Sequence, residues 1–287
     1  MTPHNTPTAN PHTAPHIAIV GGGIIGLSSA WYLCAQGYRV SVFERGVCGG
    51  KNEGAASWAG GGVISALPPS TYPAAVNALI DWSATRYGAL CAQLLAETGI
   101  DARYEVSGLH IHPSPSAPLS EGEMGTYLPH VAQVHNPSLC RALAAALRLR
   151  GVAIHEHTTA HVWLVDGITQ GVKIGDEGIA ADTVVLATGA WMDLAGTSLT
   201  VQPVKGQMLR LMPVTSPVPP PPPNTRKLAS GTPTRGEGAP SIQLFPTHYL
   251  IPRRDGSLLL GSTVEQVGFD THPTAAAKGA LLKHAMD

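Results

Sequence analysis

Three glycines and one glutamate near the start of the chain have the residue types and spacing of a dinucleotide-binding site. Gly21, Gly23 and Gly26 follow a short apolar segment, and Glu44 comes eighteen residues after Gly26. Glycines let a backbone approach a pyrophosphate closely, and a carboxylate at the end of the next strand accepts ribose hydroxyls. The same carboxylate would repel a 2′-phosphate. The pattern therefore predicts binding of a dinucleotide with an unphosphorylated adenosine ribose.

These residues need a strand, a helix and a second strand to position them. Residues 17–20 are branched and apolar, which is typical of a buried parallel strand. Residues 24–36 predict a helix that ends at Gly37, and residues 39–43 predict the second strand, with Glu44 at its tip. The helix N-terminus would offer unpaired N–H groups and a partial positive charge to the phosphates.

Two later segments would approach the same ligand. In the glycine-rich loop 45–69, Ser57 could donate its hydroxyl to a phosphate, and the glycine run could approach a flat ring. A flexible connector is the alternative for this loop. Residues 181–191 predict a buried strand whose carboxyl end brings Thr188 and Gly189 close to a cofactor, as strand ends do in doubly wound sheets. An ordinary core strand is the alternative there.

Composition excludes several classes of function. The net charge of −1 over 287 residues gives no electrostatic basis for binding nucleic acid or an anionic membrane. The five glycines from Gly21 to Gly37 argue against a membrane span. A signal peptide requires basic residues before its apolar segment, and residues 1–15 contain no lysine or arginine. The four cysteines form no CxxC pair, so we expect reduced thiols and a cytoplasmic protein. Histidines lack metal-spaced carboxylate or cysteine partners, so no metal site is expected.

The rest of the chain alternates helical and strand patterns. The predicted helices cover residues 72–99, 137–150 and 274–286. The predicted strands and hairpins cover 103–112, 152–156, 161–178, and 247–253 with 257–265.

Several segments taken together resemble the D-amino-acid oxidase-like family of FAD-dependent oxidoreductases, and within it the bacterial glycine oxidases of thiamine biosynthesis. The resemblance rests on the segments IAIVGGGIIGLSSAWYL, SWAGGGVIS, VVLATGAW, PVKGQML and YLIPRRDGSLLLGST. The first segment is shared by many flavoproteins, whereas the later ones in this order are more specific.

The resemblance implies an α/β fold, in which a Rossmann-like FAD-binding domain is interleaved with an antiparallel-sheet substrate domain. The composition of residues 1–15, rich in Pro, Thr, Asn and His, predicts a disordered tail. Residues 16–80 and 135–205 would bind FAD, and residues 81–134 and 206–287 would form the substrate domain.

The resemblance also implies the roles of individual residues. Tyr249 and Val264 would line the substrate pocket, and no residue is assigned with certainty to catalysis. The residues expected to hold FAD are Gly21, Gly23, Ile24, Ile25, Gly26, Glu44, Arg45, Ser57, Ala59, Gly60, Gly61, Val162, Thr188 and Gly189.

In this family a neutral amine loses hydride to flavin N5, the imine hydrolyses, and O₂ reoxidises the flavin with release of H₂O₂. The family arginine that binds the substrate carboxylate lies on a strand reading W-A-G-L-R-P, which has no counterpart here. The part of the family fold that contains it would follow Asp287, so the sequence predicts a C-terminally truncated member.

The sequence is also compatible with other functions. An amine or D-amino-acid dehydrogenase would pass electrons to another acceptor, and a non-catalytic remnant would bind flavin without turnover. An NAD-dependent dehydrogenase fits least, because it gives the Ser57 loop no role. The expected partner is a small amino acid, and the sequence is compatible with a monomer or a homo-oligomer.

Overall fold

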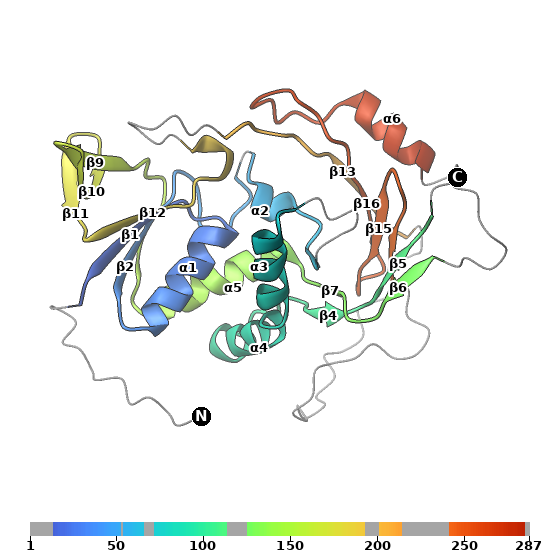
Figure 1. Ribbon diagram of the computed structural model, residues 1–287, viewed down its shortest axis with the longest axis horizontal. Coiled ribbons are helices and arrows are strands. Elements are labelled where there is room, and N and C mark those ends of the chain that lie inside the picture. The colour runs from blue at the N-terminus through green and yellow to red at the C-terminus, as the bar shows by residue number, and fades with distance from the viewer. Residues whose placement is uncertain are drawn as a thin grey trace. The chain divides into compact units, whose positions relative to one another are not determined.

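The computed structural model describes residues 14–52, 54–65, 72–113, 125–192, 201–213 and 241–284. Residues 1–13 of the expected tail lie outside this part of the chain. The chain divides into two compact units, each assembled from separated segments. The first unit comprises residues 1–60, 91–102 and 136–202, and the second comprises residues 61–90, 103–135 and 203–287. Figure 1 labels their elements.

The first unit is built on a four-stranded parallel sheet in the order β12-β1-β2-β8. Its strands are β1 (His16–Val20), β2 (Arg39–Phe43), β8 (Ala153–His155) and β12 (Thr183–Leu186). All five residues of β1 are buried, because this strand lies inside the sheet with β2 and β12 on either side. The apolar run that predicted this strand is therefore explained by burial on both faces.

Two helices of the first unit pack against each other, α1 (Ile24–Ala35) and α5 (Asn136–Leu149). Gly37, at φ +87°, ends α1, and the Gly37 N–H donates to the Cys34 carbonyl at 3.0 Å. Helix α5 is strongly amphipathic, and its buried face includes Leu139, Leu143 and Leu147.

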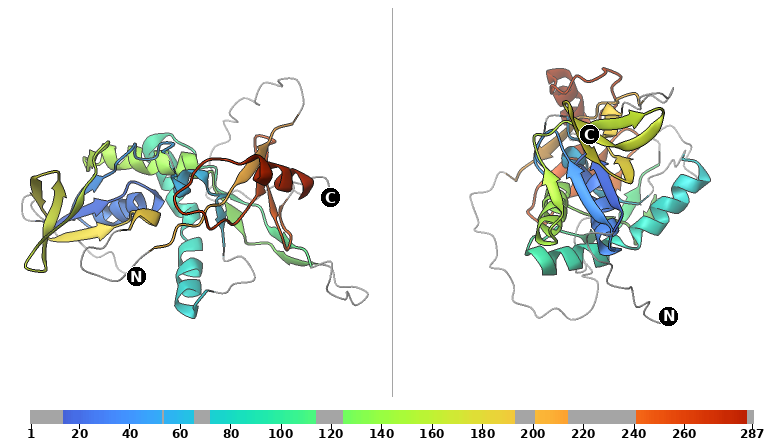
Figure 2. Two further views of the ribbon diagram at one scale, coloured as in Figure 1. Left: turned by 90° about the horizontal axis from the view of Figure 1, so that it is seen from above. Right: turned by 90° about the vertical axis from the view of Figure 1, so that its left-hand side faces the viewer.

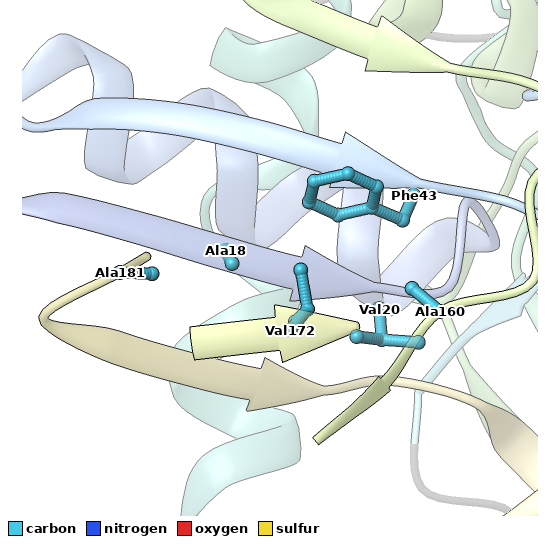
Figure 3. Close-up of a cluster of buried hydrophobic side chains, with 6 residues drawn as sticks. All are labelled: Ala18, Val20, Phe43, Ala160, Val172 and Ala181. Carbon is cyan, nitrogen blue, oxygen red and sulfur yellow. The ribbon is translucent and has the colours of Figure 1, made fainter. Parts of the chain in front are cut away.

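The other side of the parallel sheet is covered by an antiparallel sheet, β11-β10-β9. Its strands are β9 (His161–Val165), β10 (Ile168–Ile174) and β11 (Glu177–Ala180). Val172 of β10 packs with Ala18, Val20 and Phe43 of the parallel sheet, as Figure 3 shows. Ala160, directly before β9, belongs to the same cluster, so β9 begins beside the carboxyl ends of β1 and β2.

The expected strand 181–191 is shorter and more exposed than the sequence predicted. Strand β12 ends at Leu186, and a 3₁₀ helix follows at Gly189–Trp191. None of the four β12 residues is fully buried, because β12 is the edge strand of the parallel sheet. A short helix of this unit, α2 (Ala56–Ala59), packs against α5.

The second unit contains a six-stranded sheet in the order β13-β16-β15-β14-β5-β6 and a three-stranded sheet in the order β3-β7-β4. All pairings are antiparallel except that of β14 with β5. The strands are β3 (Val63–Ile64), β4 (Glu105–Val106), β5 (Leu109–Ile111), β6 (Thr126–Leu128), β7 (Ala132–Gln133), β13 (Met208–Leu211), β14 (Ile242–Leu244), β15 (Tyr249–Pro252) and β16 (Leu258–Gly261).

The expected helix 72–99 is two helices, α3 (Ala74–Ala84) and α4 (Tyr87–Thr98). The break follows from competition for the Trp82 carbonyl. In a continuous helix this oxygen would accept the Arg86 N–H, but it accepts the Thr85 hydroxyl at 3.0 Å and Arg86 Nη1 at 2.6 Å instead. The final helix is α6 (Ala275–His284), and Figure 2 gives two further views of these elements. No helix in the described ranges combines the length and apolar character needed to cross a bilayer.

Candidate cofactor site

A pocket of about 430 Å³ lies in the first unit, where the parallel strands end. The turn after β1, the tips of β2 and β12, the loop before α2, and the start of β9 form its walls. Eight of the residues expected to hold a cofactor line this pocket: Gly21, Gly23, Glu44, Arg45, Ser57, Val162, Thr188 and Gly189. Its volume is in the range of about 300–1,000 Å³ that is typical of small-molecule sites.

The glycine turn accepts no side chain at two of its positions. Gly21 has φ +112°, and a Cβ there would lie 2.4 Å from the Ala187 carbonyl oxygen. A Cβ on Gly26 would lie 1.9 Å from the Gly21 carbonyl oxygen, so only glycine lets α1 pack this closely on the turn. These contacts bring the start of α1 to the end of β1 and leave backbone, not side chains, facing the pocket.

The N-terminus of α1 is capped by a residue from another segment. Gly23 is the N-cap and has no side chain to offer, but the Ser57 hydroxyl oxygen accepts the Ile24 N–H at 3.0 Å. The first intrahelical bond is Leu27 N–H to Gly23 carbonyl at 2.9 Å, so the Ile25 and Gly26 N–H groups have no partner within the helix. This end can bind an anion, and the Ser57 hydroxyl still has its own proton to donate.

Both carboxylate oxygens of Glu44 are held by backbone N–H groups. Oε2 accepts the Gly22 N–H at 2.6 Å and Oε1 accepts the Gly46 N–H at 2.8 Å. The Glu44 carbonyl also accepts the Thr158 N–H at 2.9 Å. Each carboxylate oxygen can accept a second hydrogen bond. Glu44 is therefore fixed in position and retains two acceptor sites for a ribose.

Two other sides of the pocket offer hydrogen-bonding groups. The Thr188 Oγ1 atom is buried and has no hydrogen-bond partner among the residues that the structure describes. Strand β9, which contains Val162, is an edge strand of its sheet, so within the part of the chain that the structure describes the outer backbone groups of β9 have no strand partner. A flat heterocycle with donors and acceptors at its edge matches such a strand.

Arg45 is placed differently from the other residues expected in the site. Its guanidinium carbon lies 3.8 Å from the centre of the Trp191 ring, and both residues line the pocket. Arg45 itself is exposed. The stacked Arg45 and Trp191 side chains therefore lie at the rim of the pocket, where the guanidinium supplies a positive charge.

Six expected cofactor residues do not line the pocket. Ile24 and Gly26 support it from α1, whereas the Ile25 side chain is 64% exposed. Ala59 is in α2, and the Gly60 carbonyl accepts Asn136 Nδ2 at 3.2 Å. Gly61 belongs to the second unit.

The two expected substrate residues also belong to the second unit. The Tyr249 hydroxyl donates to the Met208 sulfur at 3.0 Å, and Val264 is 78% exposed. Arg253 lies nearby in sequence, but its guanidinium donates to the Gly61 and Val134 carbonyls at 2.6 and 3.0 Å and to Gln133 Oε1 at 2.7 Å. Burial lowers the pKa of Arg253. These three acceptors commit Arg253 to the fold of the second unit.

Sequence reasoning missed several lining residues. Thr158 and Thr159 follow β8, which lies beside β2 in the parallel sheet. The predicted strand 152–156 could have indicated them, because all parallel strands end at the same edge of a sheet. Cys140 also lines the pocket, and burial raises the pKa of its thiol to about 11. That thiol is neutral near pH 7 and is a packing group.

The pocket fits a dinucleotide such as FAD. The glycine turn and the α1 N-terminus suit a pyrophosphate, Glu44 suits a ribose, and the β9 edge suits an adenine. The buried Thr188 hydroxyl needs a partner, and a bound polar ligand would supply one.

Comparison with known proteins agrees with this fit. Residues 16–124 and 110–287 match the family described as FAD dependent oxidoreductase. The chain is 35% identical to the glycine oxidase of Pseudomonas aeruginosa over 305 residues, which cover 94% of this chain and 77% of that protein. It is 30% identical to the bifunctional protein ThiO/ThiG of Trichormus variabilis, over 94% of this chain and 43% of that protein.

A solved structure shows the same fold. Glycine oxidase from Bacillus cereus superposes with a TM-score of 0.72 at 21% identity, over 95% of this chain and 79% of that one. The chain therefore belongs to the FAD dependent oxidoreductase family, it has the fold of that family's glycine oxidases, and its cofactor is FAD.

Proposed function

We propose that this protein oxidises a small amino acid, glycine or a related amine, with O₂ as the acceptor and H₂O₂ as a product. The observation that supports this most strongly is the 35% identity to a glycine oxidase over 94% of the chain. The likeness to a bifunctional protein ThiO/ThiG supports a place in thiamine biosynthesis. We further propose that the protein acts in the cytoplasm.

FAD, when bound, supplies the hydride acceptor. The residues of this chain bind and orient it. The α1 N-terminus and the Ser57 hydroxyl would hold the pyrophosphate, Glu44 would accept the ribose hydroxyls, and Thr188 would donate its hydroxyl proton to the cofactor. We assign the first unit to the cofactor and the second to the substrate, with Tyr249 and Val264 in its pocket. No acid or base is needed if the substrate arrives as a neutral amine.

The proposal is tested with the purified protein loaded with FAD. Glycine, N-methylglycine and D-alanine are added anaerobically while the visible absorbance of the flavin is followed, and O₂ uptake and peroxide release are then measured in air. Bleaching of the flavin by at least one of these amines, followed by peroxide release, is the expected result. A protein that retains FAD but is bleached by none of them would overturn the proposal. Bleaching with dye reduction but without O₂ uptake would overturn the choice of acceptor.

A further inference from the structure

We propose that Trp191 is a positioning residue for FAD, because it holds the Arg45 guanidinium flat at the rim of the cofactor pocket. The guanidinium carbon lies 3.8 Å from the centre of the Trp191 ring. Arg45 follows Glu44 at the tip of β2, and Trp191 ends the 3₁₀ helix after β12. The contact therefore joins two separate walls of the pocket.

The charge of the pocket explains why this arginine matters. Among the lining residues that the structure describes, Arg45 is the only lysine or arginine, and Glu44 is the only carboxylate. FAD brings a doubly negative pyrophosphate. The α1 N-terminus offers only a partial positive charge, so Arg45 supplies the one permanent positive charge among the described lining residues.

An exposed arginine without a partner samples many rotamers, and holding it on binding costs side-chain entropy. The Trp191 ring removes much of that cost before FAD arrives, because a guanidinium stacks favourably on an indole face. Trp191 would thus strengthen FAD binding through Arg45. This inference depends on the cofactor but not on the identity of the amine substrate.

The test is a double-mutant cycle on the dissociation constant for FAD, measured by titrating apoprotein and following flavin fluorescence. We expect Trp191→Leu to weaken binding about threefold, the size of an exposed cation–π contact. We expect Arg45→Gln to weaken binding about tenfold, the size of a lost charge-assisted contact. The double variant should bind no more weakly than Arg45→Gln alone, because Trp191 acts through Arg45.

The dependence of FAD affinity on ionic strength is a second measurement, because a purely structural role for Trp191 would not change it. Raising the salt concentration should weaken FAD binding less in Trp191→Leu than in the unaltered protein, because the attraction of a fixed charge is what salt screens. Trp82→Leu is the matched control. Trp82 is also stacked by an arginine, with the Arg86 guanidinium carbon 3.6 Å from its ring centre, but it lies in α3 and does not line the pocket. It should leave FAD affinity unchanged.

Two results would overturn the proposal. One is an additive cycle, in which the double variant shows the sum of the binding free energies lost in the Trp191 and Arg45 variants. The other is an unchanged dissociation constant in Trp191→Leu with the fold intact by circular dichroism. If Trp191→Leu fails to fold, Trp191→Phe keeps a ring and packs in its place, and it should show a smaller loss with the same dependence on Arg45.

Discussion

The Ser57 hydroxyl oxygen accepts the Ile24 N–H at 3.0 Å, so a residue 33 positions further along the chain caps helix α1. A Cβ on the N-cap residue Gly23 would lie 3.0 Å from Ser57 Oγ, a tight contact that would shift the capping hydroxyl. The glycine turn and the loop that carries Ser57 therefore form one structure. A change in either affects both the stability of the first unit and its affinity for FAD.

Replacing Ser57 by alanine should lower both stability and affinity. Loss of a helix cap costs about 0.5–2 kcal/mol, and the hydroxyl would also be lost to the cofactor. Urea unfolding of the apoprotein gives the first quantity and FAD titration the second. Ser28→Ala is the control, since the Ser28 hydroxyl donates to the Ile24 carbonyl at 2.7 Å within the same helix. Equal losses in the two variants would contradict the role of Ser57 as a cap.

Replacing Gly26 by alanine should prevent normal folding of the first unit. The added Cβ would lie 1.9 Å from the Gly21 carbonyl oxygen, which cannot move without opening the turn. We expect a loss of roughly 3 kcal/mol or more in unfolding free energy, at the upper end for overpacking. Gly279→Ala in α6 is the matched control, because its Cβ would meet nothing within 4 Å. That variant should gain about 0.5–1 kcal/mol from helix propensity. A folded Gly26→Ala protein with normal FAD affinity would show that the turn can open to admit a Cβ.

Glu44→Gln keeps the shape of the side chain but removes one of its two acceptor oxygens. Either the Gly22 or the Gly46 N–H then faces an amide NH₂ group. An unpaired backbone donor costs about 1–3 kcal/mol, so both apoprotein stability and FAD affinity should fall. Isothermal titration and thermal unfolding of the same sample separate the two effects. The exposed residue Glu177 provides the control variant Glu177→Gln. Unchanged FAD affinity in Glu44→Gln would exclude Glu44 from ribose binding.

Acid should selectively weaken the turn between β15 and β16. Burial alone would raise the pKa of Asp255, but hydrogen bonds from Ser257 and the charges of Arg210 and Arg103 outweigh burial and lower the pKa to about 2. A lowered pKa contributes stability above the unfolded value, and this stability is lost as the pH falls from about 4 to about 2.

We therefore expect Asp255→Asn to lose roughly 1 kcal/mol at pH 7, a value reduced for solvent screening. The difference from the unaltered protein should shrink by pH 3. Urea unfolding at both pH values measures it, and Asp166→Asn in the exposed turn between β9 and β10 is the control. A gap that stays constant with pH would contradict the ion-pair explanation.

The start of the fold could be predicted from the sequence because its signals are local. Burial on both faces explains the apolar run of β1, and positive φ explains Gly21 and Gly37. The turn residues Asp255-Gly256, between the strand segments 247–253 and 257–265, likewise predicted the pairing of β15 with β16, which is confirmed. In each case the residues that determine the structure are neighbours in the sequence.

The remaining features depend on individual side-chain contacts or on contacts between distant residues. The break at Thr85 follows from side-chain bonds to the Trp82 carbonyl, which no periodicity indicates. Strand β12 reads as a core strand, yet it lies at the edge of its sheet, because no further strand among the described residues pairs with it. Thr158 and Thr159 could be predicted to line the pocket only from the position of β8 next to β2.

The open edge of β9 affects how this site can change over time. Strand hydrogen bonds come from the main chain, so any residue other than proline at position 162 presents the same N–H and C=O. Substitutions there can accumulate without disturbing the groups that an adenine would meet. Residue-by-residue comparison of relatives will therefore underrate this wall of the pocket, and only its three-dimensional outline will reveal it.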